Sequence, residues 1–363
     1  MKGKRSAPRP QGDKPGKIGL PKVKLAEVAE AAGVSAATVS RVLNNSTVVS
    51  DALRKKVEKA AQKLGYVADG AARALASRRS RALGAVVPNL SNTIFSDMIE
   101  AFQQRLEPHG YTTLLATFDY DEAAEYRAVR TMLERGVDGI VLVGVTHGKE
   151  LLTLLEKAAI PFVQTWAPAR ASKFPTIGYD NALAARLLVD HLVGLGHRDI
   201  GIVAGQTRHN DRVRARVAGL RAAMKRHRLA LPVDRVVETE YKIAKIRDAF
   251  RGFQRKGEMP TALIANNDIV ALGLLMEAQA QGIQVPKQLS ITGVGDLEIV
   301  AHIKPALTTL RTPKRAFGTM AADYLLARIQ GHEFVIPDEL PLELVVREST
   351  APPRASRNKD KDE

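Results

Sequence analysis

Cysteine is absent from this 363-residue sequence. Without a thiol the chain can form no disulfide, no thiolate metal site and no cysteine nucleophile. It also lacks any run of about 18 apolar residues, the length needed to span a membrane. The basic N-terminus, MKGKRSAPRPQGDKPGK, has neither the apolar segment nor the cleavage site of a secretory signal. These absences predict a cytoplasmic protein.

The common catalytic motifs are missing as well. No GxGxxG follows the first predicted strand, and the chain has no GxxxxGK[ST] phosphate loop and no GxSxG elbow. The eight histidines are scattered, and none forms HExxH or another metal-ligand spacing. GVGDLE at residues 293–298 has too few ligands to close a metal loop. We therefore expect no enzyme, no metal and no cofactor.

Positive charge is concentrated near the N-terminus. Residues 1–81 contain 18 Lys and Arg against 6 Asp and Glu, a net charge of +12 out of +15 for the chain. The remaining residues are nearly neutral, so the basic region is expected to bind a polyanion. Its first part, residues 1–20, is rich in Pro, Gly and Lys with little to bury, and we predict that it is disordered.

Residues 25–44, LAEVAEAAGVSAATVSRVLN, predict two short helices joined by a tight turn. Apolar residues recur at helical spacing on both sides of Gly33, which supplies the left-handed conformation that a short turn needs. Ser35 can cap the second helix, and Val39 with Val42 closes the pair into a small core. This pattern is typical of a helix-turn-helix, whose second helix enters the DNA major groove.

The outward residues of the second helix distinguish this motif from the alternative, an ordinary helical hairpin within a larger core. They are small, hydroxylated or cationic, which suits the groove floor and the phosphates. The DNA-contacting residues that we predict in and beside the motif are Lys24, Ser35, Ala36, Ala37, Thr38, Ser40, Arg41 and Asn44.

A third helix and a linker complete the N-terminal region. Residues 51–64 predict a helix capped by Ser50, so the DNA-binding domain covers residues 21–66. The linker, residues 67–81, contains a helix too short to persist alone in water, and we expect it to order only on DNA. Arg73 lies within it, and Leu75 is its one bulky apolar side chain. Leu75 can insert into the minor groove, with simple packing as the alternative.

From residue 82, short apolar segments alternate with amphipathic helices, which is typical of parallel sheets covered on both faces. About 250 residues exceed one such sheet, so we expect two doubly wound α/β subdomains. The subdomains are expected to comprise residues 82–179 with 310–338 and residues 180–309 with 339–348, followed by a disordered tail, 349–363. The predicted strands are 82–87, 112–116, 139–143, 162–165, 176–178, 200–204, 235–238, 262–265 and 289–293.

Polar and aromatic residues follow several of these strands, where ligands bind in this architecture. After the first strand, PNLSNTIF places Ser91 and Asn92 at a helix N-terminus, which favours an anionic or hydroxylated ligand. Trp166, the only tryptophan, is the kind of aromatic face that holds a sugar-like ligand. Each residue alone also fits a helix cap or a solvated loop, and the prediction depends on their recurrence. The predicted ligand-site residues are Ser91, Asn92, Phe95, Thr146, His147, Trp166, Arg216, Asn267 and Asp296.

Five stretches resemble signature segments of the lactose/galactose (LacI) repressor family: LAEVAEAAGVSAATVSRVLNN, LGYVADGAARALA, LGHRDIGIVAG, ANNDIVALGLL and PALTTLRTP. They follow the family's order from about residue 22 to about residue 348. The resemblance implies a nucleoid-associated homodimer, or a tetramer, with a periplasmic-binding-protein-like body that binds a pseudo-palindromic operator in double-stranded DNA. It also implies a small-molecule effector. The roles that it implies are base reading by Ala36, Ala37 and Arg41, minor-groove insertion by Leu75, and effector binding by Arg216 and Asn267.

Within that family, PNLSNTIFSDMI, TH at 146–147, QTW at 164–166 and GVGDLEIVAHIKPALTTLR are similar to gluconate-utilisation repressors. This similarity implies a sugar or sugar-acid effector, with Arg216 and the helix N-terminus near Ser91 as carboxylate partners. An activator or a corepressor-dependent repressor of the same architecture is an alternative. A solute-binding module for transport is a remote alternative, because export would need a signal peptide.

Overall fold

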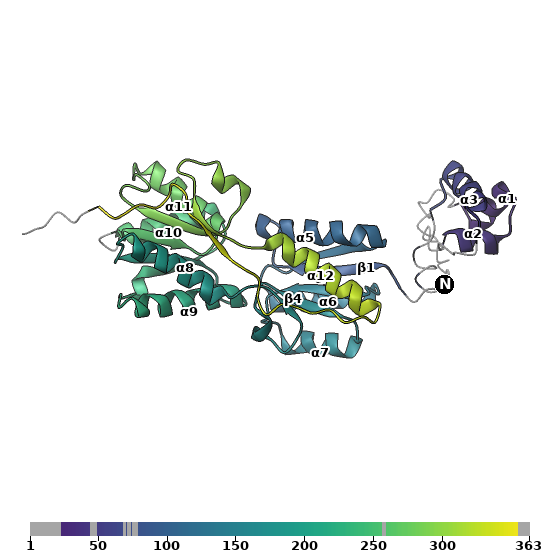
Figure 1. The fold of residues 1–363 in the computed structure, drawn as a ribbon, viewed down its shortest axis with the longest axis horizontal. Helices are drawn as coiled ribbons and strands as arrows, with labels where there is room; N and C mark the ends of the chain where they lie inside the picture. The colour runs from purple at the N-terminus through teal and green to yellow at the C-terminus, as the bar shows by residue number, and fades with distance from the viewer. Residues whose placement is uncertain are drawn as a thin grey trace, which may run out of the picture. The chain divides into compact units, whose positions relative to one another are not determined.

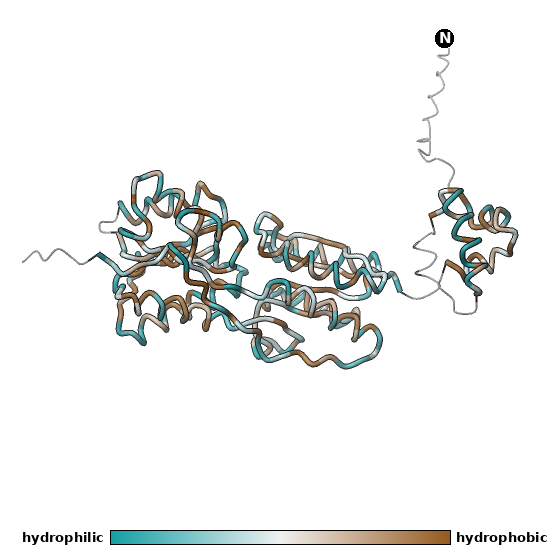
Figure 2. Tube along the Cα trace, turned by 45° about the horizontal axis from the view of Figure 1, so that its top comes forward, coloured by the Kyte–Doolittle hydropathy of each residue, from teal (hydrophilic) through white to brown (hydrophobic). Residues whose placement is uncertain are grey.

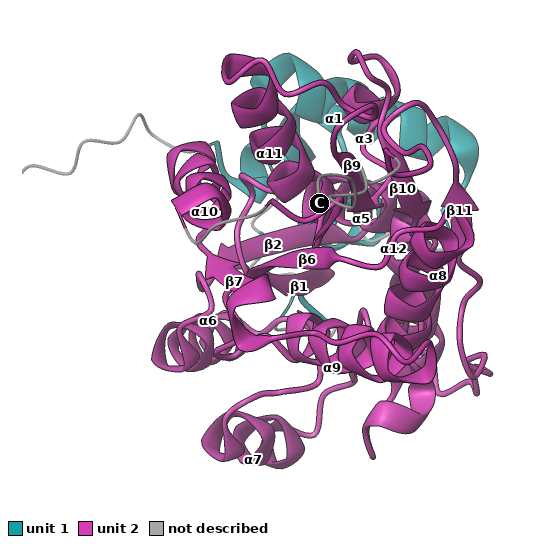
Figure 3. Cartoon of the chain, turned by 90° about the vertical axis from the view of Figure 1, so that its left-hand side faces the viewer, with its two compact units in different colours: residues 1–80 teal, residues 81–363 magenta. Residues whose placement is uncertain are grey.

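The computed structural model describes residues 23–43, 49–67, 70, 74, 79–255 and 259–354. The chain divides into two compact units, residues 1–80 and residues 81–363, which Figure 3 colours teal and magenta. The tail 1–20 and the predicted DNA contacts Asn44, Arg73 and Leu75 lie outside the described residues. Among the helices that are described, none has the length and apolar character to cross a membrane.

The helices whose bounds are described in the first unit are α1 (Leu25–Ala32), α2 (Ala36–Leu43) and α3 (Asp51–Leu64). Val28, Val39 and Val57, one from each helix, are fully buried in their common core. Gly33 ends α1 with the predicted left-handed backbone, at a φ of 59°. Ser50 occupies the N-cap position of α3, but its side chain makes no capping hydrogen bond, contrary to our prediction.

The second unit contains a five-stranded parallel sheet in the order β2-β1-β3-β4-β5. Two pairs of helices cover its faces, α5 with α12 and α6 with α7 (Figure 1). The strands are β1 (Ala82–Val87), β2 (Thr112–Thr117), β3 (Gly139–Val143), β4 (Phe162–Thr165) and β5 (Thr176–Ile177). The helices are α5 (Thr93–Leu106), α6 (Glu122–Glu134), α7 (Lys149–Ala158) and α12 (Lys314–Ile329), with short 3-10 turns at Glu107–His109 and Ala169–Ala171.

A six-stranded sheet follows in the order β11-β10-β9-β8-β6-β7. Helices α8 and α9 pack together at one face, and α10 and α11 pack together at the other. The strands are β6 (Ile200–Gly205), β7 (Val236–Thr239), β8 (Ala262–Ala265), β9 (Ser290–Gly295), β10 (Thr308–Arg311) and β11 (Glu343–Val345). The helices are α8 (Asn181–Gly194), α9 (Asp211–Arg226), α10 (Ile243–Arg255) and α11 (Asp268–Ala280), with 3-10 turns at Val233–Arg235 and Glu298–Ala301.

Burial explains why these segments form strands. Every residue of the central strands β1, β3, β6, β8 and β9 is buried, as expected for strands covered on both faces, whereas the edge strand β2 is partly exposed. The hydropathy colouring in Figure 2 shows hydrophobic residues along the strands and hydrophobic and hydrophilic residues alternating along the helices. The prediction of two parallel-sheet α/β subdomains is confirmed.

Three details of the predicted organisation are wrong. β10 and β11 were not predicted, and β11 pairs antiparallel with β10. Because β10 belongs to the second sheet, the approximate subdomain boundary predicted at residue 310 falls within this strand, two residues before its end. The disordered tail predicted from residue 349 begins too early, because Ser349 is fully buried. Its Oγ donates to the carbonyl of Ile291 at 2.6 Å and accepts from the amide of Thr308 at 2.8 Å.

Candidate DNA-binding surface and ligand pocket

Helix α2 carries five of the ten predicted DNA contacts, and three of these five are exposed. Ser35 precedes it, and the Ser35 Oγ accepts a hydrogen bond from the amide of Thr38 at 3.1 Å. This N-cap satisfies a donor that the first turn of a helix otherwise leaves unpaired. Ala36, Ala37 and Arg41 are exposed on the helix that follows. A short helix with these side chains exposed fits the major groove of DNA.

The ends of α1 and α2 are held by neighbouring residues. Lys24 is exposed before α1, and its amide donates to Glu27 Oε1 at 3.2 Å. Ser40 is partly buried on α2. Arg54 of α3 donates to the carbonyl of Val42 at 3.3 Å, so a positive charge lies at the C-terminal end of α2. This placement complements the negative end of the helix dipole and fixes the orientation of α2 in its unit.

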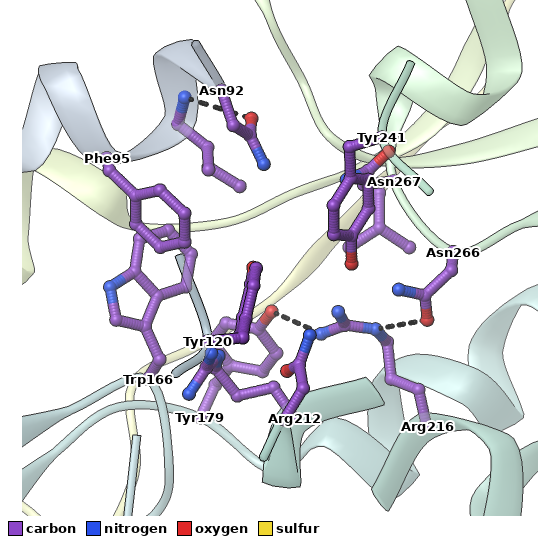
Figure 4. Close-up of a pocket in the computed structure, with 13 residues that line it drawn as sticks. Asn92, Phe95, Tyr120, Trp166, Tyr179, Arg212, Arg216, Tyr241, Asn266 and Asn267 are labelled. Atoms are coloured by element: carbon purple, nitrogen blue, oxygen red, sulfur yellow. Dashed lines mark hydrogen bonds between the residues drawn. The ribbon is translucent and has the colours of Figure 1, made fainter. Parts of the chain in front are cut away.

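In the second unit, residues that follow strands of both sheets enclose a pocket (Figure 4). Its volume is about 30 Å³, room for about two water molecules, so a sugar-sized ligand enters only if the walls separate. The lining residues are Asn92, Ile94, Phe95, Tyr120, Trp166, Tyr179, Asn210, Arg212, Arg216, Tyr241, Asn266, Asn267 and Val294.

Aromatic rings form one wall of the pocket. The Trp166 ring lies edge-on to Phe95, with centroids 5.6 Å apart, and to Phe317 at 4.7 Å. The indole N–H donates to the sulfur of Met98 at 3.3 Å, so Trp166 offers the pocket its apolar face. Trp166 and Tyr120 have positive φ values of 70° and 60°. Such backbone conformations are uncommon in residues with a side chain and concentrate at functional sites.

Two asparagines shape the pocket by starting the helices that border it. The side-chain oxygen of Asn92 accepts from the amide of Ile94 at 3.4 Å, at the start of α5. The side-chain oxygen of Asn267 accepts from the amide of Val270 at 2.9 Å, at the start of α11. Each asparagine is buried and follows a strand closely, so strand and helix together fix its position.

Arg216 of α9 lies at the opposite wall among neutral groups. It is 8% exposed, and it donates to Asn266 Oδ1 at 3.0 Å, to the Tyr179 hydroxyl at 3.3 Å and to the side-chain oxygen of Asn181. No carboxylate among the described residues lies within ion-pair distance of it. A buried cation without an anionic partner is unusual, because burial removes its hydration.

Arg212 lies one helical turn before Arg216 and is 5% exposed. Burial acts to lower the pKa of Arg212, but Asp211 and the nearby tyrosine hydroxyls raise it above its ordinary value, so the guanidinium stays charged. Of the described residues that line the pocket, only these two arginines are charged. The pocket is therefore electropositive.

Three tyrosines add neutral donors to the same space. Burial raises the pKa of Tyr120, Tyr179 and Tyr241 above the usual value, although the neighbouring arginines oppose this shift. Their hydroxyl groups therefore stay protonated at neutral pH and can donate to a ligand oxygen. With the arginines and asparagines, the pocket contains several donors suited to a hydroxylated, oxygen-rich molecule.

The structure brings five of the nine predicted ligand-site residues to this pocket and places four elsewhere. Ser91 is exposed, and its hydroxyl donates to Asn89 at 3.1 Å. Thr146 accepts from Arg214 at 2.8 Å. Those in the pocket are Asn92, Phe95, Trp166, Arg216 and Asn267.

His147 and Asp296 have structural partners outside the pocket. His147 Nδ1 lies 2.9 Å from Glu125, and Nε2 lies 3.0 Å from the carbonyl of Gly144. Asp296 pairs with Arg311 and Arg347, both at 2.7 Å. The pocket residues absent from the predicted set are Ile94, Tyr120, Tyr179, Asn210, Arg212, Tyr241, Asn266 and Val294.

The missed residues could have been found by extending one rule. Tyr120 and Tyr241 closely follow the edge strands β2 and β7, and Arg212 lies in the first turn of the helix after β6. The strand-end rule applies to edge strands as it does to central ones. The sequence thus contained the signal for these three residues.

Comparisons with known proteins match both regions. The model of the bacterial regulatory proteins of the lacI family matches residues 24–69, and that of a periplasmic binding protein-like domain matches residues 189–350. The chain is 32% identical over 318 residues to the HTH-type transcriptional regulator GntR of Escherichia coli (strain K12), covering 88% of this chain and 95% of that one. The chain belongs to the LacI family.

Two further LacI-family relatives agree with this assignment. The transcriptional repressor PurR of Vibrio parahaemolyticus is 32% identical over 321 residues, covering 85% of this chain and 92% of that one. The structure of the lac repressor dimer bound to operator and the anti-inducer ONPF superposes with a TM-score of 0.80 at 28% identity, covering 91% and 99% of the two chains. This LacI-family chain is a DNA-binding transcriptional repressor, and the relatives named here are regulators, not enzymes.

Proposed function

We propose that this repressor binds a pseudo-palindromic operator as a homodimer and that a sugar acid of the gluconate type, bound in the pocket, releases it. The observation that supports an acid is the charge of the pocket, where the only charged residues among the described lining are Arg212 and Arg216. A neutral sugar would leave both guanidinium groups without an added counter-charge. The aromatic wall around Trp166 and the neutral donors suit the hydroxylated carbon chain.

On the DNA side, the proposal assigns the reading of bases to the outer face of α2. Arg41 reaches a guanine edge, and the methyl groups of Ala36 and Ala37 lie against thymine methyl groups. Phosphate and groove contacts come from Lys24, Ser35, Thr38, Ser40 and Asn44. In the linker, Arg73 contacts phosphate and Leu75 inserts between base pairs of the minor groove.

The effector controls DNA binding only through its different affinities for two arrangements of the α/β subdomains. An arrangement that separates the two linkers of a dimer prevents them from folding together in the minor groove, so the repressor leaves the operator. The coupling is reciprocal, so operator DNA lowers the affinity for the effector by the same factor. If gluconate instead increased the affinity for the operator, the chain would be a corepressor-dependent repressor.

The full-length protein is first used to select operators from random DNA. Its affinity for a selected operator is then measured by fluorescence anisotropy with and without D-gluconate. Arg41→Ala is expected to weaken binding about 10- to 100-fold, because a lost bidentate base contact has that effect. Lys63→Ala, which removes an exposed charge from α3, is the matched control and is expected to change affinity much less. Equal losses in both variants would contradict base reading by Arg41, and operator affinity unaffected by gluconate would exclude this effector.

A further inference from the structure

Arg212 has a buried nitrogen, Nη2, that makes no hydrogen bond of normal geometry in the described part of the chain, although the Tyr120 hydroxyl lies near the guanidinium and helps to raise its pKa. The other terminal nitrogen, Nη1, donates to Asp211 at 2.9 Å. Buried polar groups in folded proteins are nearly always paired, so an unpaired one in a pocket points to a ligand. Because the group is cationic, the ligand atom that it receives is an anionic or carbonyl oxygen.

A second unpaired donor lies in the same pocket. Asn266 is 1% exposed, and its Nδ2 makes no hydrogen bond of normal geometry with a described residue, although Asn266 lies close enough to the Tyr241 hydroxyl to oppose the rise in the pKa of that group. The orientation of this amide is fixed, because its oxygen accepts from Arg216 Nε at 3.0 Å and the nitrogen must therefore be the free end. Figure 4 shows Asn266 beside Arg216 and the Arg212 side chain extending toward Tyr120 and Trp166. Free donors from two elements thus accompany the guanidinium of Arg216.

The charges at this wall specify the charge of the ligand. Two guanidinium groups face one carboxylate, that of Asp211, which pairs with Arg212. The other carboxylate oxygen of Asp211 accepts from the amide of Val145 at 3.2 Å, so its position is fixed. One positive charge is left over at this wall, and a singly charged acid balances it; Asp268, a further buried carboxyl group next to the pocket, is already hydrogen-bonded to Thr309 and Leu297. The two oxygens of a carboxylate match the planar fork of a guanidinium.

We infer that Arg212, assisted by Asn266, receives the carboxylate of a singly charged acidic effector and sets the preference for acids over neutral polyols. This inference rests on the proposed function, which places the effector in this pocket. It moves the carboxylate to α9 from the N-terminus of α5, where the exposed Ser91 donates to Asn89. The hydroxylated chain of the ligand then extends toward Trp166 and the asparagines that start α5 and α11.

Binding to the full-length protein, measured by calorimetry and by Trp166 fluorescence, tests the inference. The probes are D-gluconate, its neutral counterpart sorbitol, and the diacid D-glucarate. Wild type is expected to bind gluconate about 100-fold more tightly than either other probe. Sorbitol lacks the charged hydrogen bond to the carboxylate, and glucarate adds a second charge that has no partner. Arg212→Met is expected to lose most of the preference for gluconate over sorbitol by weakening gluconate alone.

Two further variants make the result specific. Arg221→Met removes an exposed arginine from the same helix and is expected to behave as wild type. Arg212→Lys keeps the charge without the planar fork and is expected to retain part of the preference, which provides a result if Arg212→Met fails to fold. The inference would be overturned if either Arg212 variant kept the full preference for gluconate over sorbitol. It would also be overturned if wild type bound sorbitol as tightly as it binds gluconate.

Operator binding by the same preparations separates this inference from the proposed function. If the protein binds its selected operator but none of the acids, the effector is not an acid, and the inference fails while the repressor remains. If gluconate binds in an Arg212-dependent way but does not alter operator affinity, the carboxylate site stands and the proposed release of DNA fails.

Discussion

Asp268, the first residue of α11, is a carboxyl group buried next to the ligand pocket. It is 1% exposed and accepts from Thr309 Oγ1 at 2.6 Å and from the amide of Leu297 at 2.8 Å. These bonds attach the loop after β9 and the strand β10 to α11. Burial is the main cause that raises the pKa of Asp268 to about 6, and the nearby Asp296 adds to it, whereas the two donors and Lys314 act in the opposite direction.

The raised pKa predicts how stability depends on pH. In the unfolded chain an aspartate titrates near pH 3.9, so between about pH 4 and 6 the folded protein keeps a proton that the unfolded chain has lost. This stabilising contribution is complete below about pH 4 and is lost as the pH rises through 6, by about 2 to 3 kcal/mol. Asp268→Asn removes this titration. Urea denaturation of both proteins at pH 4 to 7 measures the difference between their free energies of unfolding. The free energy of wild type relative to Asp268→Asn is expected to fall as the pH rises, and a difference that does not change with pH would contradict the raised pKa of Asp268.

The sequence predicts a pocket residue correctly when its place just after a central strand is enough to bring it to the pocket. Asn92 and Asn267 follow central strands and lie in the pocket, as predicted. Thr146 and His147 also follow a central strand, but Arg214 and Glu125 occupy their polar atoms. Those partners come from other elements, so the local sequence contained no sign of them. Position along a strand therefore predicts proximity to the site, while side-chain orientation depends on tertiary partners.

At the scale of elements, the loop after β3 and the first turn of α9 form a cleft latch between the two sheets. The amide of Val145 donates to Asp211 at 3.2 Å, and Arg214 Nη2 donates to Thr146 Oγ1 at 2.8 Å. β3 belongs to the first sheet, and α9 packs on the second. Both hydrogen bonds therefore stabilise the arrangement in which the pocket walls are close together.

Removal of the cleft latch is expected to open the cleft. Arg214→Met deletes the bond to Thr146, and a hydrogen bond of this kind contributes about 0.5 to 1.5 kcal/mol, or about 2- to 10-fold in an equilibrium. Small-angle scattering should show a larger radius of gyration without ligand, and gluconate affinity should fall by a similar factor, because closure then costs more. Arg221→Met, on the same helix, is the control. Unchanged scattering and affinity would show that the latch does not hold the cleft.

Most strands were predictable because their signal is local. Each of the nine predicted strands lies within two residues of its observed bounds, since buried parallel strands are continuous apolar runs between helices. β11 is only three residues long and partly exposed, and it exists because β10 offers an unpaired edge. β10 in turn extends the second sheet beside β9. Their pairing depends on distant partners, so periodicity along the chain could not reveal either strand.

For the whole molecule, the second sheet carries an apolar surface on and beside α11. Met276 is 50% exposed there and Ile299, on the 3-10 turn after β9, is 57% exposed. Large exposed apolar side chains are typical of interaction sites, and methionine packs well against varied partners. Next to Met276 is a groove of about 510 Å³, lined by Leu272, Leu275, Met276, Gln279, Ile283, Val285, Ile303, Lys304 and Pro305.

We propose that this groove surface contacts a second copy of the chain. A two-fold interface brings the same surface of both subunits together, and a pseudo-palindromic operator needs two DNA-binding domains related by that symmetry. Met276→Glu would bury a carboxylate from each subunit in the interface without a partner, which costs several kcal/mol. Sedimentation should therefore find a dimer in wild type and a monomer in this variant. In the proposed complex two linkers pair in the minor groove, so operator affinity should fall in the monomer, whereas gluconate affinity should persist because the pocket lies within one chain.

Val233→Glu separates this effect from a general effect of added charge. Val233 is 82% exposed in the same subdomain but does not line the groove, so this variant should remain dimeric. If Met276→Glu also remained dimeric, the dimer contact would lie on another surface. If instead it became monomeric and still bound the operator as tightly as wild type, dimerisation would not be required for operator recognition. The two measurements together therefore test the dimer contact and its role in DNA binding independently.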